Sequence, residues 1–168
     1  MRPSNPFPRL LLAVALTLPV AARPMPAQTT GVDSSKPFTL DSMKSYYRPI
    51  LVFAPSATPD FIQQLKLLEG HGSEVTERDV VILPLPAKGG FFTGTHFNKA
   101  EAGHMTASEA AHAREQFHIE PTGLTVLLLG KDGEEKFRSQ TPVTWDRLRE
   151  LIDSMPMRQE EDKDRSKK

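Results

Sequence analysis

The chain has 168 residues, of which 38% are hydrophobic, and its 21 basic and 21 acidic side chains give a formal net charge of zero. This length suits one domain and is short for two, and the balanced charge gives no reason to expect a nucleic acid as partner. The absence of cysteine excludes disulfides, thiolate metal ligands and thiol-based redox chemistry.

Residues 1–22 are typical of a cleavable secretion signal. Two arginines precede an apolar run over residues 10–22, which is shorter than the roughly 20 residues that span a bilayer. Small residues place the cleavage after Ala22 or Ala27. The alternative is an uncleaved membrane anchor, against which Pro19 and the shortness of the run argue. We therefore expect a secreted or periplasmic protein with no stable membrane anchor after cleavage.

Residues 23–45 are rich in Pro, Thr, Ser and Gln, and they predict a flexible leader that ends in a short helical or irregular turn. Its sizeable apolar groups are Phe38, Leu40 and Met43, and Phe38 and Leu40 are candidates to pack on the domain. The folded domain is predicted over residues 46–157.

Two strands and one helix are predicted at the start of the domain. A continuous apolar run at residues 49–53 predicts a buried first strand, and DVVILPL, residues 79–85, predicts the second. Between them, Thr58 caps a helix that begins with proline and continues until Gly70 and Gly72. The apolar residues of this helix have helical spacing and are Phe61, Ile62, Leu65 and Leu68. Together these segments form a βαβ unit.

Residues 87–107 are rich in glycine and predict a long loop. Loops of this length inside a compact domain are often functional or mobile. Phe91 and Phe92, with Phe97, either cover the end of the core or form a patch that binds a partner. Phe91 and Phe92 are therefore candidate contact residues.

The second half of the domain begins with a helix over residues 109–117, for which Ser108 is the expected cap. The apolar run 124–129 predicts a central strand that is covered on both faces. The alternating segment 135–138 predicts a neighbouring strand with one face in water. Residues 131–134, KDGE, predict the hairpin turn between them, because glycine takes the positive φ that the turn requires.

Thr144 caps a predicted last helix that ends at Pro156. Its apolar residues recur at helical spacing and are Trp145, Leu148, Leu151, Ile152 and Met155. Residues 158–168 are charged and predict a disordered tail. With right-handed crossovers, the order βαβ-α-ββα predicts an α/β fold: a four-stranded mixed sheet in a three-layer α/β/α sandwich, as in thioredoxin-like proteins.

Four stretches carry a resemblance to a known family, and they are YYRPILVFAPSATPDFIQQLKLL, ERDVVIL, LTVLLLGKDGEEKFRS and TPVTWDRLRELIDSMPMRQEE. From about Met43 to Glu161 the chain resembles the family described as domain of unknown function 4174, with the GKDG turn and the terminal SMPMRQ as the most specific motifs. Such domains also occur in animal extracellular-matrix proteins that carry sushi repeats or the coiled-coil-domain name. The resemblance implies a thioredoxin-like fold and no settled activity.

The redox site of thioredoxins has no counterpart in this chain. Thioredoxins carry Cys-x-x-Cys where the first strand ends and the first helix begins, and Ser56, Thr58 and Asp60 stand there instead. Thr125 stands where a thioredoxin has its cis-proline, counted back from the hairpin turn. The candidate ligand or partner surface comprises Ser56, Thr58, Asp60, Thr125, Phe91 and Phe92.

Ser56 has two interpretations. Backbone N–H groups collect where a strand ends and a helix begins, so an anion or a carbonyl oxygen could be held beside this hydroxyl. No GxSxG motif surrounds Ser56, however, and an ordinary loop or cap serine explains it. No catalytic residue is therefore assigned.

A metal site is the third kind of chemistry that the sequence raises. His112 shares a helix face with Glu109 and Glu115, and His96 or His104 could fold back over them, with His118 nearby. No HExxH motif is present, and an exposed polar helix face explains the same residues. No metal ligand or cofactor is assigned. The remaining charges singled out by the sequence are interpreted as turn and surface charges, and they are Lys131, Asp132, Arg138 and Arg158.

The sequence thus favours an exported thioredoxin-like domain that acts by binding an unidentified protein or small ligand outside the cytoplasm, with no nucleic acid as partner. The competing hypothesis is an enzyme with non-thiol, oxidoreductase-related chemistry at the junction of the first strand and first helix. Dithiol–disulfide exchange is excluded by composition.

Overall fold

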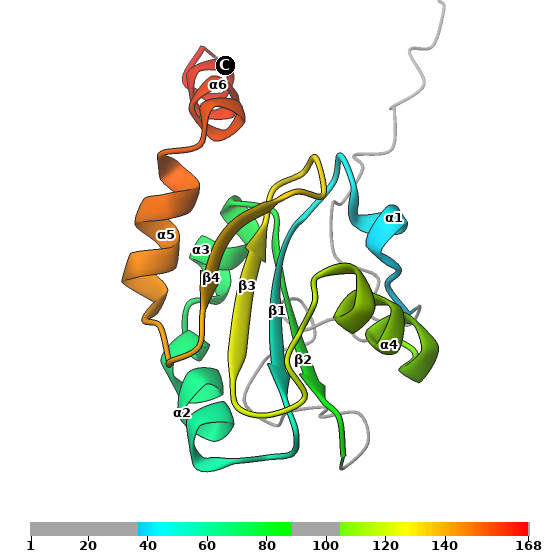
Figure 1. Ribbon diagram of the computed structural model, residues 1–168. Helices are drawn as coiled ribbons and strands as arrows, with labels where there is room; N and C mark the ends of the chain where they lie inside the picture. Colours follow the sequence, from blue (N-terminus) through cyan, green and yellow to red (C-terminus); the bar gives the residue numbers. More distant parts are fainter. Residues whose placement is uncertain (1–36, 89–104, 168) are drawn as a thin grey trace, which may run out of the picture. The chain divides into compact units, whose positions relative to one another are not determined.

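The computed structural model describes residues 37–88 and 105–167, all within one unit of the chain. The predicted signal segment and the candidate residues Phe91 and Phe92 lie outside the described residues. In the part that is described, no helix is long and apolar enough to cross a membrane. The elements in chain order are α1 Leu40–Met43, β1 Arg48–Ala54, α2 Pro59–Leu68, α3 Gly72–Glu77, β2 Val80–Pro86, α4 Ala107–Gln116, β3 Thr125–Leu129, β4 Glu135–Ser139, α5 Trp145–Asp153 and α6 Pro156–Arg165 (Figure 1).

The four strands form one mixed sheet in the order β2-β1-β3-β4. β1 is parallel to β2 and antiparallel to β3, and β3 is antiparallel to β4. Every residue of β1 and β3 is buried. Leu127 lies at the centre, paired with Leu51 on one side and with Arg138 on the other. The predicted four-stranded mixed sheet and its central apolar strand are confirmed.

Helices cover both faces of the sheet. Side chains alternate along β1, so that Val52 packs on the face covered by α2 and α5, and Phe53 on the face covered by α1 and α4. Figure 1 shows these two pairs of helices on opposite sides of the sheet. Phe61 and Trp145 fill the first layer, and Met43 belongs to the second. The structure is therefore the predicted three-layer sandwich.

β2 is an edge strand of the described sheet, and two of its residues are prolines. The N–H of Ala87 donates to the carbonyl of Ala54 at 2.8 Å, so residue 87 faces β1. Every second residue of a strand faces the same neighbour, so the odd-numbered residues of β2 also face β1. Pro84 and Pro86 therefore occupy outward positions, where the missing N–H costs the sheet no hydrogen bond.

The hairpin turn between β3 and β4 is also as predicted. Gly133 has a φ of +79°, and its N–H donates to the carbonyl of Gly130 at 3.0 Å. The N–H of Gly130 in turn donates to the carbonyl of Glu134 at 2.9 Å. Gly133 thus supplies the left-handed conformation that closes the hairpin.

The domain begins earlier than the predicted boundary at residue 46. Phe38 and Leu40 pack on the sheet as the sequence suggested, and Met43 is buried beside them. The Thr39 side chain accepts a hydrogen bond from the N–H of Ser42 and forms a capping box with it. The short helical turn predicted at the end of the leader is therefore confirmed as α1, whereas the predicted start of the domain at residue 46 is too late, because an apolar cluster and a cap order residues 38–43.

Two details of the helices differ from the predictions. α4 is capped by Thr106, whose hydroxyl accepts from the N–H of Glu109 at 3.2 Å, so the prediction of Ser108 as cap is wrong. The short helix α3 was not predicted, because it starts at a glycine, has no side-chain cap and buries only Val75. Such a helix has no apolar periodicity for a sequence pattern to show.

α6 contradicts the prediction of a disordered tail from residue 158 onward. The helix starts at Pro156 and extends through Arg165. Its one buried residue is Arg158. An amphipathic helix is normally recognised in a sequence by a stripe of apolar residues. In α6 a charged side chain, Arg158, takes the buried position instead.

Candidate functional site

The junction of β1 and α2 is the site that the sequence predicts. Ser56 and Asp60 are exposed there. The Thr58 hydroxyl accepts a hydrogen bond from the N–H of Phe61 at 3.3 Å and so caps α2. Ser56 and Asp60 are therefore available to a partner, whereas the Thr58 hydroxyl is already engaged. We call this junction, residues 55–60, the β1–α2 corner.

Thr125 lies beside the corner but not on its surface. It is the first residue of β3, pairs with Phe53, and is only 4% exposed. No peptide bond among the described residues is cis. Thr125 thus forms part of the sheet beneath the corner, where it cannot contact a partner directly.

A pocket with an accessible volume of about 130 Å³ opens where β2 ends and α4 begins. The N–H of Lys88 donates to the carbonyl of Pro55 at 3.1 Å, which ties the exit of β2 to the corner. The pocket is lined by Pro84, Leu85, Pro86, Ala87, Met105, Thr106, Ala107 and Ala110. This largely apolar lining suits an apolar group rather than a charged one. We call it the β2 exit pocket.

Arg114 stiffens the wall of this pocket. Its guanidinium lies 5.0 Å from the centre of the Phe53 ring and donates to the carbonyl of Leu85. Burial lowers the pKa of Arg114. An arginine remains charged even so, and it acts here as a structural bridge between α4 and β2.

The described residues hold no group of three or more His, Asp or Glu side chains that could bind a metal ion. Nδ1 of His118, which follows the end of α4, lies 2.9 Å from the carbonyl oxygen of Glu115 in that helix. His96 and His104 lie outside the described residues. The convergence of ligands that the sequence raised as an alternative is therefore not seen in the part that the structure describes.

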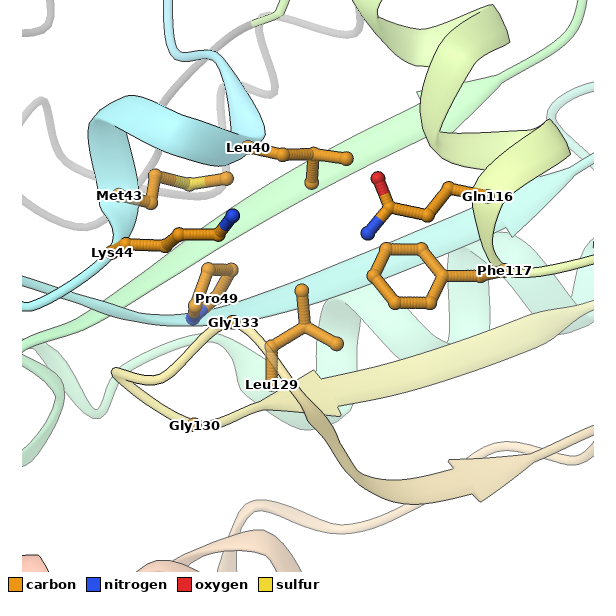
Figure 2. A pocket seen from close by; sticks show the side chains of 9 residues that line it. All are labelled: Leu40, Met43, Lys44, Pro49, Gln116, Phe117, Leu129, Gly130 and Gly133. Atoms are coloured by element: carbon orange, nitrogen blue, oxygen red, sulfur yellow. The ribbon is translucent and has the colours of Figure 1, made fainter.

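A second, much smaller pocket lies between α1, the end of α4 and the hairpin turn (Figure 2). The side chains of Leu40, Met43, Phe117 and Leu129 point toward one another around it. Its accessible volume of about 10 Å³ is no more than the space of one water molecule. This pocket is a packing gap in the core and not a ligand site.

Charged side chains gather at the opposite end of the sheet, and the sequence did not predict this cluster. Arg48 is the first residue of β1 and is only 1% exposed. Its Nη1 donates to the carbonyl of Arg78 at 2.9 Å, and its Nη2 donates to Oε1 of Glu161 at 3.0 Å. A guanidinium removed from water requires such partners. Arg48 therefore joins the start of the sheet to α6.

Glu161 is surrounded by three cations. Its Oε1 also accepts from Nζ of Lys131 at 2.8 Å, and Nη1 of Arg158 lies 3.9 Å from its Oε2. Lys131 has a second partner, Oδ2 of Asp79 at 2.8 Å. We call Arg48, Lys131 and Arg158, arranged around this carboxylate, the Glu161 cradle.

Arg158 and Lys131 were predicted to be surface and turn charges. For Arg158 the prediction is wrong, whereas Lys131 lies in the hairpin turn as predicted, although its side chain is not on the open surface. Arg158 is 1% exposed, and its Nη2 contacts Glu77 and Asp162 at 2.9 Å each. Lys131 is largely buried by its two ion pairs. Asp132 lies in the same turn and is exposed, as predicted. Each of the two cations pairs with an acid that is distant in the sequence, Glu77 for Arg158 and Asp79 for Lys131, which no local pattern shows.

A wider pocket, with an accessible volume of about 430 Å³, opens beside the Glu161 cradle. It is lined by Arg48, Gly130, Lys131, Asp132, Lys136, Met155, Pro156, Met157 and Glu160. Met157 is 49% exposed, the largest apolar exposure on α6. The pocket thus combines cationic groups with an apolar wall. We call it the cradle pocket.

We expect acid to destabilise the domain through Glu161 and through Asp153, whose two carboxylate oxygens accept hydrogen bonds from Arg78 at 2.8 and 3.0 Å. Burial alone raises the pKa of Asp153 and of Glu161, but hydrogen bonds from Arg78 to Asp153, and from Arg48 and Lys131 to Glu161, bring both pKa values below the ordinary ones. A pKa that is lower in the folded state contributes stability above the unfolded-state pKa, and this stability is lost as the pH falls through the folded-state pKa. The urea concentration at the midpoint of unfolding should therefore decrease as the pH is lowered from neutral to about 3.

Glu161→Gln should flatten this dependence, because the amide does not titrate. The matched control is Glu150→Gln on the exposed side of α5, whose carboxylate lies 3.8 Å from Arg147. Equal slopes of the urea midpoint against pH for the two variants would contradict the assignment of Glu161.

Comparison with known proteins agrees with this fold. The model of the family described as Domain of unknown function (DUF4174) matches residues 39–161. The structure of thioredoxin peroxidase I from Plasmodium yoelii is similar at 14% identity and a TM-score of 0.51, covering 72% of this chain and 79% of that one. StoA from Bacillus subtilis has 22% identity and a TM-score of 0.47, covering 63% and 82%. No curated protein matches the chain significantly. The peroxidase shows a shared thioredoxin-like fold and, at this identity, no more.

Proposed function

This chain belongs to the family described as Domain of unknown function (DUF4174), and from its thioredoxin-like fold without cysteine we propose that it is an exported binding domain. Export rests on the secretion signal predicted over residues 1–22. Binding replaces thiol exchange, because no residue of the chain can form a disulfide. The partner is a protein or small ligand outside the cytoplasm.

The observation that carries the proposal is the β1–α2 corner. Thioredoxins place their reactive cysteines at this corner, so the fold presents it to a partner. In this chain Ser56 and Asp60 remain exposed there, and the β2 exit pocket opens next to them. A polar rim beside an apolar pocket is the usual composition of a binding surface. Phe91 and Phe92 remain predicted members of this surface.

The lack of cysteine makes the proposal directly testable. Ser56→Cys gives the chain from Gln28 to Lys168, which lacks the predicted signal, a single thiol to which a photocrosslinker can be attached. We expect a defined crosslinked product with the extracytoplasmic fraction of the source organism. The control is Ser154→Cys, which places the same label at the exposed end of α5. A product formed through residue 154 and not through residue 56 would contradict the corner as the contact surface.

Two further variants sharpen this experiment. Ala107→Trp fills the β2 exit pocket from an exposed position and should reduce the Ser56→Cys product, whereas Ser108→Trp, its exposed neighbour outside the pocket, should not. The wild-type chain should show no turnover in insulin-reduction and peroxidase assays. Turnover that disappears with Ser56→Ala would replace the binding proposal with the non-thiol enzyme.

A further inference from the structure

α6 is attached to the domain by charges rather than by apolar packing. Arg158 is its one buried residue, and the ion pairs of Glu161 and Arg165 reach Arg48, Lys131 and Asp79. Apolar burial is the main stabilising term for most surface helices, and α6 has almost none of it. The helix is therefore held at two places: by Glu161 in its cradle, and by Arg158 and Arg165, which donate to Glu77 at 2.9 and 2.7 Å.

Arg48 and Lys131 are positioned without help from α6. Nη1 of Arg48 is fixed by the carbonyl of Arg78, and Nζ of Lys131 is fixed by Asp79. The Lys131 carbonyl accepts from the N–H of Ser45 at 2.6 Å, which anchors the hairpin turn to the chain before β1. Both cations would thus keep their places if Glu161 withdrew. A binding site whose groups are fixed in advance loses little entropy when a ligand enters.

Glu161 fills this site imperfectly. Oε1 accepts both hydrogen bonds, from Arg48 and from Lys131. Oε2 is buried and has no hydrogen-bond partner among the described residues. A buried carboxylate oxygen without a donor costs free energy. A carboxylate that is not restrained by a helix could instead present one oxygen to each cation, which leaves neither oxygen without a donor.

We propose that Arg48 and Lys131 form a binding site for a carboxylate that carries an apolar group, and that Glu161 of α6 occupies this site in cis. The cradle pocket supplies the route, because Arg48 and Lys131 line it together with Met155 and Met157. The cations hold the carboxylate, and the methionines contact the apolar group. The ligand displaces Glu161 and thereby loosens α6, which keeps the contacts of Arg158 and Arg165 with Glu77.

The acids around the site select a single negative charge. Asp79 accepts a hydrogen bond from Lys131, and Asp132 and Glu160 line the cradle pocket. Exchange of one carboxylate for another leaves the local charge unchanged, whereas a doubly charged phosphate would add repulsion from these acids. Lys136 adds no free cation, because it is paired with Asp132 at 2.5 Å and with Glu134 at 3.0 Å.

The first test uses Glu161→Ala, which empties the site in the otherwise intact chain. The probes are acetate, hexanoate and the neutral hexanamide at constant pH and ionic strength. We expect the melting temperature of Glu161→Ala to rise with hexanoate, less with acetate, and not with hexanamide. The control is Glu160→Ala, the neighbouring acid that lines the same pocket. Equal responses of the two variants to hexanoate would overturn the proposal.

The second test uses the native Glu161 and does not depend on the fold of a weakened variant. A fluorophore on Ser166→Cys, at the end of α6, reports the mobility of the helix through its anisotropy. Hexanoate should lower the anisotropy at concentrations at least about tenfold above those that stabilise Glu161→Ala, because the tethered Glu161 competes. Anisotropy that responds equally to hexanoate and hexanamide, or to neither, would contradict displacement.

Two probes separate the sources of such a carboxylate. A short peptide that ends in leucine with a free carboxylate, and its amidated form, represent a protein C-terminus, whereas hexanoate represents a free organic acid. Tighter binding of the free peptide assigns a peptide terminus, and tighter binding of hexanoate assigns an organic acid. The site lies at the opposite end of β1 from the β1–α2 corner, so its failure leaves the proposed function untouched, and the reverse also holds.

Discussion

Replacing Arg48 with methionine should lower the free energy of unfolding by about 3 kcal/mol. The substitution keeps most of the side-chain volume, so that the loss reports the charge and its hydrogen bonds. The buried carbonyl of Arg78 loses its donor, and Glu161 is left to share Lys131 with Asp79. Urea unfolding at neutral pH, followed by the fluorescence of the single tryptophan, measures the change.

A double-mutant cycle separates the ion pair from general damage. Glu161→Gln in the Arg48→Met background should cost less than it does in the wild type, with a coupling energy of about 1 kcal/mol or more. Arg147→Met is the surface control, because its pair with Glu150 is exposed and 3.8 Å long, and it should change stability by less than about 1 kcal/mol. Additive effects of the Arg48 and Glu161 substitutions would show that the pair is energetically irrelevant.

Leu127→Ala should also remove about 2–5 kcal/mol, through the cavity it leaves in the middle of the sheet. Leu127 is fully buried, and both neighbouring strands pair with its backbone. The surrounding side chains come from a sheet with helices on both faces, so they have little freedom to collapse into the space. The urea midpoint should fall while the slope of the transition stays the same.

Leu151→Ala on α5 is the matched control, because the same atoms are removed from a partly buried position. Its loss should be well under that of Leu127→Ala. If the two substitutions cost the same, the core of the domain does not lie where the sheet places it.

The strands were predictable because their burial leaves a direct mark in the sequence. Strands covered on both faces need continuous apolar runs, and residues 49–53 and 124–129 are such runs. The helix ends at Thr58 and Thr144 were predictable as well, since each hydroxyl caps the helix that follows it. In each case the residues that carry the sequence pattern lie within or next to the strand or helix that they predict.

α3 and α6 could not be predicted in the same way. Each buries a single side chain, Val75 and Arg158, so neither has an apolar stripe. The candidate sites likewise include one part that the local sequence predicts and one part that it does not. The exposed positions of Ser56 and Asp60 follow from the local order of strand and helix. The cradle does not, because Arg48 and Glu161 meet across 113 residues of chain.

The two prolines of β2 determine how this domain can meet another polypeptide. A strand that added to the free edge of β2 would need N–H donors along that edge, and the prolines at residues 84 and 86 provide none. The opposite margin, β4, presents Glu135, Lys136 and Arg138. Both margins of the described sheet thus disfavour a fifth strand, and we expect this domain to recognise a partner through side chains rather than by extension of its sheet.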